Sequence, residues 1–450
     1  NYYHWWPAEK GEPPLRLSYF DEEGNAWTYN KSTDSYYLHY FSRKQPDLNW
    51  ENPEVRQEIF DMMRFWFDKG IDGFRMDSIS LIAKDPSFPL IDSKKYPDIF
   101  SFYAKEPRLH LYLHEMNRQV LSKYDCMSVG EGSAVMVDDV AKFVDPAREE
   151  LNMLYHFDAA RIRNTTLPDN PESGIDYSLI ALKKMFTEWD KAVDKGWPSI
   201  YLGNHDQPRM VSRFGSDKDE FRALSAKMLI TFLLTMRGTP YWFAGDEIGM
   251  RNIRFDRIED YNDIDTINRY KKAKAEGKDP QAVLDEQKET GRDNARTPFQ
   301  WDRSPEAGFT AGTPWLKVNP DYTWINVADE EKDPTSILNY FKKVVSFRKE
   351  NPSLIYGSYH LLDAENPQSY TFLRKTGADT YLIMLNFSPK AAISTPGIDM
   401  SNAHVLLDNY GDRSHMAPQK DITLRPFEAI VFQLNHPVYE SFIDSLDLLE

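Results

Sequence analysis

The chain has 450 residues, of which 41% are hydrophobic and 14% aromatic, and its 54 basic and 70 acidic side chains give a net charge of −16. A protein that neutralises nucleic-acid phosphates or anionic lipids needs an excess of lysine and arginine, so this balance predicts no nucleic-acid and no membrane partner. The aromatic content excludes a disordered chain, and the single cysteine excludes an internal disulfide. A neutral or cationic small molecule is the favoured ligand.

The first 52 residues are rich in tyrosine, tryptophan, proline and asparagine without a sustained period, which predicts an irregular segment and not a regular layer. The chain opens at Asn1 without an initiator methionine or a signal-peptide pattern, so we expect it to begin inside a longer protein. The sequence contains no run of about 18 apolar residues. It therefore predicts a soluble protein, cytoplasmic or periplasmic, and leaves the compartment and the oligomeric state open.

An alternation of helices and strands begins at residue 53. Apolar residues recur at helical spacing from Pro53 to Gly70, and the short run 71–77 ends in Asp77, as a buried parallel strand does where it meets a site. The pattern recurs with helix-like segments at 109–122, 177–193 and 221–236 and strand-like segments at 125–131, 149–158, 199–206 and 239–247. Such alternation predicts an α/β protein, and a TIM (β/α)8 barrel fits it best.

Two further regions complete the predicted organisation. Residues 251–332 are polar and low in periodicity, which predicts a long insertion over the site face of the barrel. One more helix is expected at 337–350, and from about residue 355 the period changes to two, which predicts antiparallel strands in a C-terminal β domain. The predicted domains are therefore 1–52, 53–354 and 355–450.

Three carboxylates, Asp77, Glu131 and Asp206, end strands of this pattern and would converge at one mouth of a barrel. Arg75 lies on the same strand face as Asp77 and would hold it ionised, as a carboxylate nucleophile requires. Glu131 lies between two glycines, where partial desolvation would raise its pKa into the range of a general acid. Acids at strand ends can also merely cap the next helix, but two acids with opposite pKa shifts are what retaining glycoside hydrolysis needs.

Five motifs carry a resemblance to a known family. They are Gly73–Asp77, Val129–Gly132, Leu202–Asp206, Gln45–Asn49 and Arg292–Trp301. The first three resemble the second, third and fourth signature regions of the α-amylase family of glycoside hydrolases (family 13). The fourth resembles the motif that marks its oligo-1,6-glucosidase subfamily, and the fifth is similar to a loop of that subfamily.

The resemblance implies a role for each matching residue. Asp77 would be the nucleophile, Glu131 the acid/base and Asp206 the stabiliser of the transition state. The implied substrate-binding residues are Arg75, Ser78, His205, Arg292 and Gln45, with the rings of Tyr155 and Phe157 either stacking on the sugar or packing in the core.

The resemblance also implies which part of the barrel the chain contains. Residues 1–52 would be the end of an inserted domain B, and residues 53–354 would hold strands four to eight. Strands one to three, the first signature region and the residues of a possible structural calcium site would lie upstream of Asn1. We therefore predict no metal and no cofactor for the chain itself.

The implied activity is that of an exo-acting, retaining α-glucosidase that removes glucose from the non-reducing end of short oligosaccharides and disaccharides. The residue after the nucleophile is commonly valine in α-1,6-specific members and alanine or threonine in α-1,4-specific members; here it is Ser78, so the linkage stays open. Sucrose isomerases and other α-glucosyltransferases share the acids and rank second, because only Arg161 and Arg163 echo their arginine-rich loop. A transporter heavy chain is a remote alternative that predicts a membrane anchor and damaged acids.

One weaker pattern concerns metal binding. His110 and His114 lie four residues apart on a predicted helix beside Glu115, as two zinc ligands would. The order differs from His-Glu-x-x-His, so a packing or surface role is predicted for both histidines.

Overall fold

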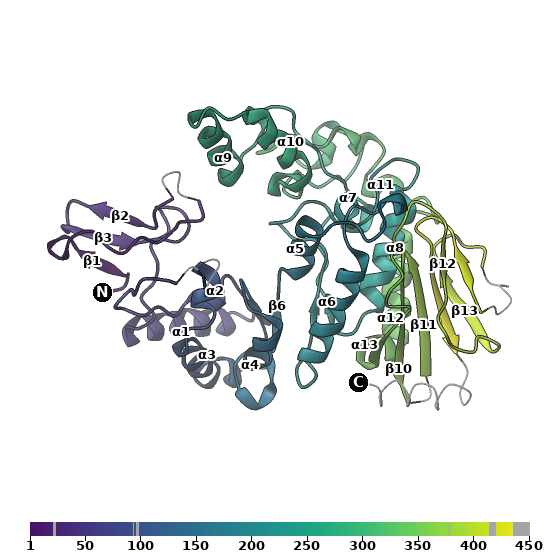
Figure 1. The fold of residues 1–450 in the computed structure, drawn as a ribbon, viewed down its shortest axis with the longest axis horizontal. Coiled ribbons are helices and arrows are strands. Elements are labelled where there is room, and N and C mark those ends of the chain that lie inside the picture. Colours follow the sequence, from purple (N-terminus) through teal and green to yellow (C-terminus); the bar gives the residue numbers. More distant parts are fainter. Residues whose placement is uncertain (21–23, 93, 96–98, 378, 414–419, 435–450) are drawn as a thin grey trace. The chain divides into compact units, whose positions relative to one another are not determined.

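A computed structural model describes residues 1–20, 24–92, 94–95, 99–377, 379–413 and 420–434 (Figure 1). The chain divides into two compact units, the first of which comprises Asn1–Phe157, Lys191–Pro198 and Ile264–Pro280, and the second Asp158–Asp190, Ser199–Asp263 and Gln281–Glu450. The predicted C-terminal β domain, 355–450, lies partly outside the described residues. The predicted division into three domains stays a prediction.

The first unit is built from short strands and helices. Its elements are β1 (Trp5–Pro7), β2 (Trp27–Asn30), β3 (Ser35–Leu38), α1 (Pro53–Asp68), β4 (Gly73–Met76), α2 (Ile99–Tyr103), α3 (Arg108–Gln119), β5 (Met127–Glu131), α4 (Ala141–Val144), β6 (Met153–Tyr155) and α9 (Ile264–Ala275). Helix α1 begins where the sequence predicts it, because the Asn52 carboxamide caps the Glu54 N–H at 3.0 Å and Pro53 fixes the first helical φ.

The first 52 residues contain a regular layer, so the prediction of an irregular segment is wrong. Strands β1, β3 and β2 form an antiparallel sheet in that order. Its hydrophobic cluster is closed by aromatic side chains, among them Trp27, Tyr40 and Phe88. The strands have only three or four residues each, too few for a period of two to emerge from the sequence.

Strands β4, β5 and β6 form a parallel sheet in sequence order, as the alternation predicts. Gly73 at the start of β4 lies opposite Met127 of β5, and an added Cβ would lie 2.0 Å from the Met127 carbonyl oxygen. This close approach sets the spacing of the two strands that lead to Asp77 and Glu131.

The second unit contains the remaining elements. They are α5 (Asp158–Thr165), α6 (Leu179–Ala192), β7 (Ser199–Ile200), α7 (Met210–Phe214), α8 (Arg222–Thr235), β8 (Thr239–Pro240), α10 (Pro280–Thr290), α11 (Val327–Glu330), α12 (Ile337–Glu350), α13 (Ser353–Tyr356), β9 (Ser358–Leu362), β10 (Ser369–Thr376), β11 (Asp379–Asn386), β12 (Ala392–Ser394), β13 (Ala403–Asp408), β14 (Ile422–Leu424) and β15 (Ala429–Leu434). Strands β7 and β8 pair in parallel, and α12 has the predicted bounds.

Residues 251–332, the predicted long insertion, contain regular structure; that they cover the site face stays a prediction. Helices α9 and α10 occupy 264–275 and 280–290. Alanine, lysine, glutamate and glutamine are good helix formers even without an apolar period. Gly277, at φ +68°, and Pro280 separate the two helices.

The C-terminal strands form an antiparallel sheet in the order β13-β15-β11-β10-β9, beside the pair β12-β14. Helices α8 and α13 pack against this sheet (Figure 1). Two buried cations join the sheet to the helices. Lys183 of α6 donates to the carbonyls of residues 363, 366 and 369, and Arg374 of β10 donates to those of residues 235, 354 and 357.

Among the described residues, no helix has both the length and the apolarity that crossing a bilayer requires.

Candidate active site

The first group of polar residues lies at the ends of β4 and β5. One guanidinium joins its two acids: Arg75 donates through Nη1 to Asp77 and through Nη2 to Glu131 Oε2 at 3.0 Å. A single guanidinium can bridge only carboxylates that lie a few ångström apart. Asp77 is exposed, with 72% of its side chain accessible, whereas Glu131 is buried. The structure therefore brings Arg75, Asp77 and Glu131 together, as the sequence predicts.

Burial controls the protonation of Glu131. It raises the pKa of this carboxyl from its ordinary 4.5 to about 7, and the negative charge of Asp77 adds to the effect. The Ser78 backbone N–H, 2.9 Å from Oε2, and the Arg75 charge act in the opposite direction but are the weaker influence. Glu131 can therefore carry a proton near neutral pH while the more exposed Asp77 faces a guanidinium.

The glycines beside Glu131 create its enclosed position. A Cβ added to Gly130 would lie within 2.9 Å of the side chains of Ile79, Leu151 and Leu154, and one added to Gly132 would lie 2.6 Å from Leu154. The chain can pass this close to the core only without side chains at both positions. The predicted constriction around Glu131 is thus formed by the side chains of Ile79, Leu151 and Leu154, which pack against the glycines.

Ser78 adopts a left-handed conformation, with φ +44°, directly after Asp77. This sharp turn aims its N–H at Glu131. The buried ring of Tyr155 lies 5.4 Å from the Arg75 guanidinium and makes an edge contact with Phe157. Ser78 and Tyr155 therefore adjoin the Arg75 group, with Tyr155 packing in the core, whereas the partly exposed Phe157 contacts Tyr155.

A second group lies in the second unit, around Asp206. The His205 ring Nε2 is 3.2 Å from Asp206 Oδ2. The other oxygen, Oδ1, accepts from Arg292 Nη1 at 3.2 Å and from Arg296 Nη2 at 2.7 Å. Arg296 also donates through Nε to the His205 carbonyl at 2.8 Å. Asp206, His205 and Arg292 thus cluster as predicted.

The sequence reasoning missed two members of the second group. Arg296 lies inside the recognised motif Arg292–Trp301 but was not singled out as a site residue. Asp263 is buried and pairs with Arg292 Nη2 and, at 3.7 Å, with Arg296 Nη1. It lies in an acidic, irregular stretch, and no pattern in the sequence distinguishes it from Asp260 or Asp265.

Gln45 has a local role in the structure. Its Oε1 accepts from the Ser42 N–H at 3.2 Å, within its own turn. In the same motif, Asp47 pairs with the buried Lys84 at 2.6 Å. The predicted role of Gln45 in substrate binding stays a prediction.

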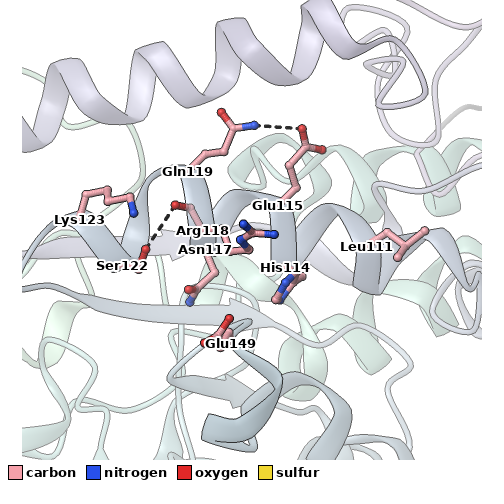
Figure 2. A pocket seen from close by; sticks show the side chains of 9 residues that line it. All are labelled: Leu111, His114, Glu115, Asn117, Arg118, Gln119, Ser122, Lys123 and Glu149. Atoms are coloured by element: carbon pink, nitrogen blue, oxygen red, sulfur yellow. Dashed lines mark hydrogen bonds between the residues drawn. The ribbon is translucent and has the colours of Figure 1, made fainter.

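A separate pocket of about 580 Å³ lies along α3 and contains none of the predicted site residues (Figure 2). His114 lines it and contacts the Arg148 carbonyl at 3.1 Å, whereas His110 contacts Glu150 at 2.8 Å. The two histidines therefore contact different residues. In the described part of the chain, no three His, Cys, Asp or Glu side chains are grouped so that they could hold a metal. The absence of a cofactor stays a prediction.

The chain matches the family described as alpha amylase, catalytic domain, over residues 1–357. It is 47% identical to the oligo-1,6-glucosidase of Parageobacillus thermoglucosidasius over 448 residues, which cover 97% of this chain and 78% of the relative. It is 38% identical to the trehalose-6-phosphate hydrolase of Bacillus subtilis, covering 96% and 76%. The chain belongs to the alpha-amylase family.

Solved structures agree with this assignment. The isomaltulose synthase SmuA of Protaminobacter rubrum superposes with a TM-score of 0.89 at 38% identity and covers 97% of this chain and 78% of that one. A trehalulose synthase has the same TM-score at 37% identity, covering 96% and 78%. The predicted TIM barrel followed by a C-terminal antiparallel β sheet is thereby confirmed. That the chain holds strands four to eight, with three strands before it, stays a prediction.

Proposed function

We propose that this glycoside hydrolase is a retaining, exo-acting α-glucosidase that releases glucose from the non-reducing end of short α-glucosides. One observation carries the proposal: the Arg75 guanidinium bridges an exposed Asp77 and a buried Glu131 whose pKa is about 7. Retaining enzymes place their two carboxyl groups about 5 Å apart, and the acid must hold a proton at the working pH.

In the first step, an Asp77 carboxylate oxygen attacks C1 of the terminal glucose. The bond between C1 and the glycosidic oxygen breaks, its electron pair passes to that oxygen, and Glu131 supplies the proton that neutralises the leaving group. A glucosyl ester of Asp77 results. In the second step Glu131 removes a proton from water, the water oxygen attacks C1, and the Asp77 carboxylate leaves. The product is α-glucose, and Glu131 is protonated again.

The Asp206 group would bind sugar hydroxyls. His205, Arg292 and Asp206 offer donors and an acceptor, and such contacts accelerate the reaction only if they strengthen as positive charge develops on the sugar. The substrate is a neutral carbohydrate, which agrees with the acidic composition of the chain. Side chains and water supply every group that this route needs, so we propose that no cofactor takes part.

The proposed linkage specificity rests on the similarity of the chain to known enzymes. Oligo-1,6-glucosidases at 47% and 44% identity support α-1,6 bonds as substrates, and an alpha-glucosidase of Pediococcus pentosaceus at 40% identity leaves room for other linkages. Ser78 matches neither the valine nor the alanine or threonine pattern, so we propose that α-1,6 and α-1,4 bonds are both cleaved.

Sucrose isomerisation is the second candidate, because two synthases of this kind superpose closely on the chain. Of the two arginines that echo their loop, Arg163 is bound to Asp176 and to the Arg213 carbonyl at 2.8 Å. Arg161 contacts Asp158 at 3.4 Å. Because both arginines have structural partners, hydrolysis is the better supported reaction.

The test is turnover of isomaltose, maltose, sucrose and trehalose by the purified protein, with identification of the products. We expect glucose from isomaltose and maltose, and no isomer of sucrose. Asp77→Asn should abolish turnover, whereas Asp72→Asn, which changes the exposed acid at the opposite end of β4, should retain it. No turnover on any of these sugars, or full turnover by D77N, would contradict the proposal.

A further inference from the structure

Four charged side chains form a closed ring of ion pairs: those of Asp206, Arg292, Arg296 and Asp263. Asp206 Oδ1 contacts Arg292 Nη1 at 3.2 Å and Arg296 Nη2 at 2.7 Å. The remaining terminal nitrogens of the two arginines both face Asp263 Oδ1, at 3.7 Å for Arg296 Nη1 and in a closer contact for Arg292 Nη2. Positive and negative groups thus alternate around the ring, and each guanidinium bridges the same two carboxylate oxygens.

The two carboxylates of the ring have different surroundings. The Asp263 side chain is only 2% exposed, whereas that of Asp206 is 26% exposed. The backbone of Asp263 is held by a third acid, because Asp293 Oδ2 accepts from the N–H groups of Asn262 and Asp263 at 2.7 and 2.9 Å. Asp263 is therefore the buried and fixed carboxylate of the ring, and Asp206 is the more accessible one.

The charges of the ring explain why a second acid is needed. Without Asp263, two guanidinium groups would share one oxygen of a single carboxylate and repel each other at close range. With Asp263, each arginine has one partner on either side, and its planar fork fits both oxygens. Asp206 Oδ1 is then occupied, and Oδ2 faces the His205 ring.

We propose that Asp263 is a positioning residue: through Arg292 and Arg296 it fixes the orientation of the Asp206 carboxylate, whose Oδ2 lies beside the His205 ring. Asp263 does not touch the substrate. The inference rests on the proposed α-glucosidase function, in which Asp206 stabilises the transition state. It accounts for a buried acid that the reaction itself does not use.

The first test is Asp263→Asn, assayed on an aryl α-glucoside and on α-glucosyl fluoride. Fluoride leaves without full protonation, so formation of the glucosyl-enzyme from it depends little on Glu131 as an acid but still requires a correctly oriented Asp206. We expect kcat to fall by roughly 100-fold on both substrates, the size of effect seen when one transition-state contact is lost. KM should change much less. Asp263→Glu, which retains the charge, should recover a large part of the loss.

The matched control is Asp321→Asn. Asp321 is also buried in the second unit, where it accepts from Arg251 Nε at 2.8 Å and from Gln300 Nε2 at 2.9 Å. This variant should lower the Tm and leave kcat unchanged in the folded protein. An equal fall of kcat in D263N and D321N would reduce Asp263 to a general stabilising residue and overturn the inference.

The second test is a double-mutant cycle with Arg296→Gln. If Asp263 acts through its arginine partners, the loss of activity in the double variant should be clearly smaller than the product of the two single losses. The double variant removes one charge of each sign, so it remains informative if D263N alone does not fold. Losses that multiply would contradict the inference. Absence of turnover in the unmodified protein would instead contradict the proposed function, whereas full kcat in D263N with an active parent would contradict this inference alone.

Discussion

Glu131 is the residue in which several opposing effects can be compared directly. Arg75 and the Ser78 N–H both favour its ionised form, yet burial raises its pKa to about 7. Asp77 shares the same arginine but is largely exposed. The difference in solvent access, and not a difference in charged neighbours, therefore separates the roles of acid and nucleophile.

The first prediction concerns the pH dependence of the proposed reaction. Because Glu131 must be protonated to act as the acid, kcat/KM should fall as the pH rises above about 7. The pH profile of kcat/KM for an aryl α-glucoside checks this. For α-glucosyl fluoride the fall should be weaker, and an equally steep fall on both substrates would assign the basic limb to another group.

The second prediction concerns stability. The folded pKa of Glu131 lies above its unfolded value, so the folded state binds the extra proton and stability decreases as the pH rises from about 4.5 to 7. Glu131→Gln removes this penalty. We expect its free energy of unfolding to exceed that of the parent by on the order of 2 kcal/mol at pH 8 and to match it near pH 4. Urea denaturation at both pH values measures the difference; a destabilised variant at pH 8 would refute it.

Strands β4 and β5 show how an element positions the site. Their spacing depends on Gly73, where a Cβ would collide with the Met127 carbonyl. A backbone carbonyl cannot move away as the end of a flexible side chain can. The third prediction is that Gly73→Ala lowers the free energy of unfolding by about 3 kcal/mol, as measured in urea.

The control for this prediction is Gly312→Ala. At Gly312 an added Cβ has no neighbour nearer than 3.8 Å, so the change should be close to neutral. Equal stabilities of G73A and G312A would mean that the strands can separate without cost.

Long helices with one apolar face were predictable from the sequence, and short or polar elements were not. Helices α1 and α12 have clear caps, Asn52 and Ser336, and apolar residues at helical spacing. Strands β1–β3 are too short to show a period, and α9 and α10 rely on helix propensity instead of an apolar face. For these elements the decisive contacts are made by distant residues.

The candidate site was predictable where a motif ends a strand and not where the residues meet through the fold. Asp77, Glu131 and Asp206 each follow a recognisable run. Asp263 gains its position from Arg292 and Arg296, about 30 residues further along the chain. A single sequence does not reveal such a pairing, because acids are common in the surrounding stretch.

At the scale of the whole molecule, buried cations join the C-terminal sheet to the helices. Arg374 donates to the Leu354 and Gly357 carbonyls at 2.8 and 2.7 Å and also to that of Thr235. The fourth prediction is that Arg374→Met removes the donor to the Thr235 and Gly357 carbonyls, whereas the Leu354 carbonyl keeps that of Arg348, and that the change costs about 3 kcal/mol of stability.

Thermal or urea unfolding checks this prediction. The control is Lys375→Met, a change at the next residue, which is only partly buried; it should alter stability by less than about 0.5 kcal/mol. Similar effects of the two variants would show that the carbonyls find other donors.

The proposed reaction is a double displacement at C1, with Asp77 as nucleophile and Glu131 as acid and then base. The configuration of the first glucose released tests it most directly, since two inversions restore the original anomer. Proton NMR should follow the hydrolysis of an aryl α-glucoside, from which the only sugar released is the glucose that reacts at C1, within the first minutes and before mutarotation. A retaining mechanism predicts that α-glucose appears first and β-glucose only later; initial release of β-glucose would contradict the double displacement.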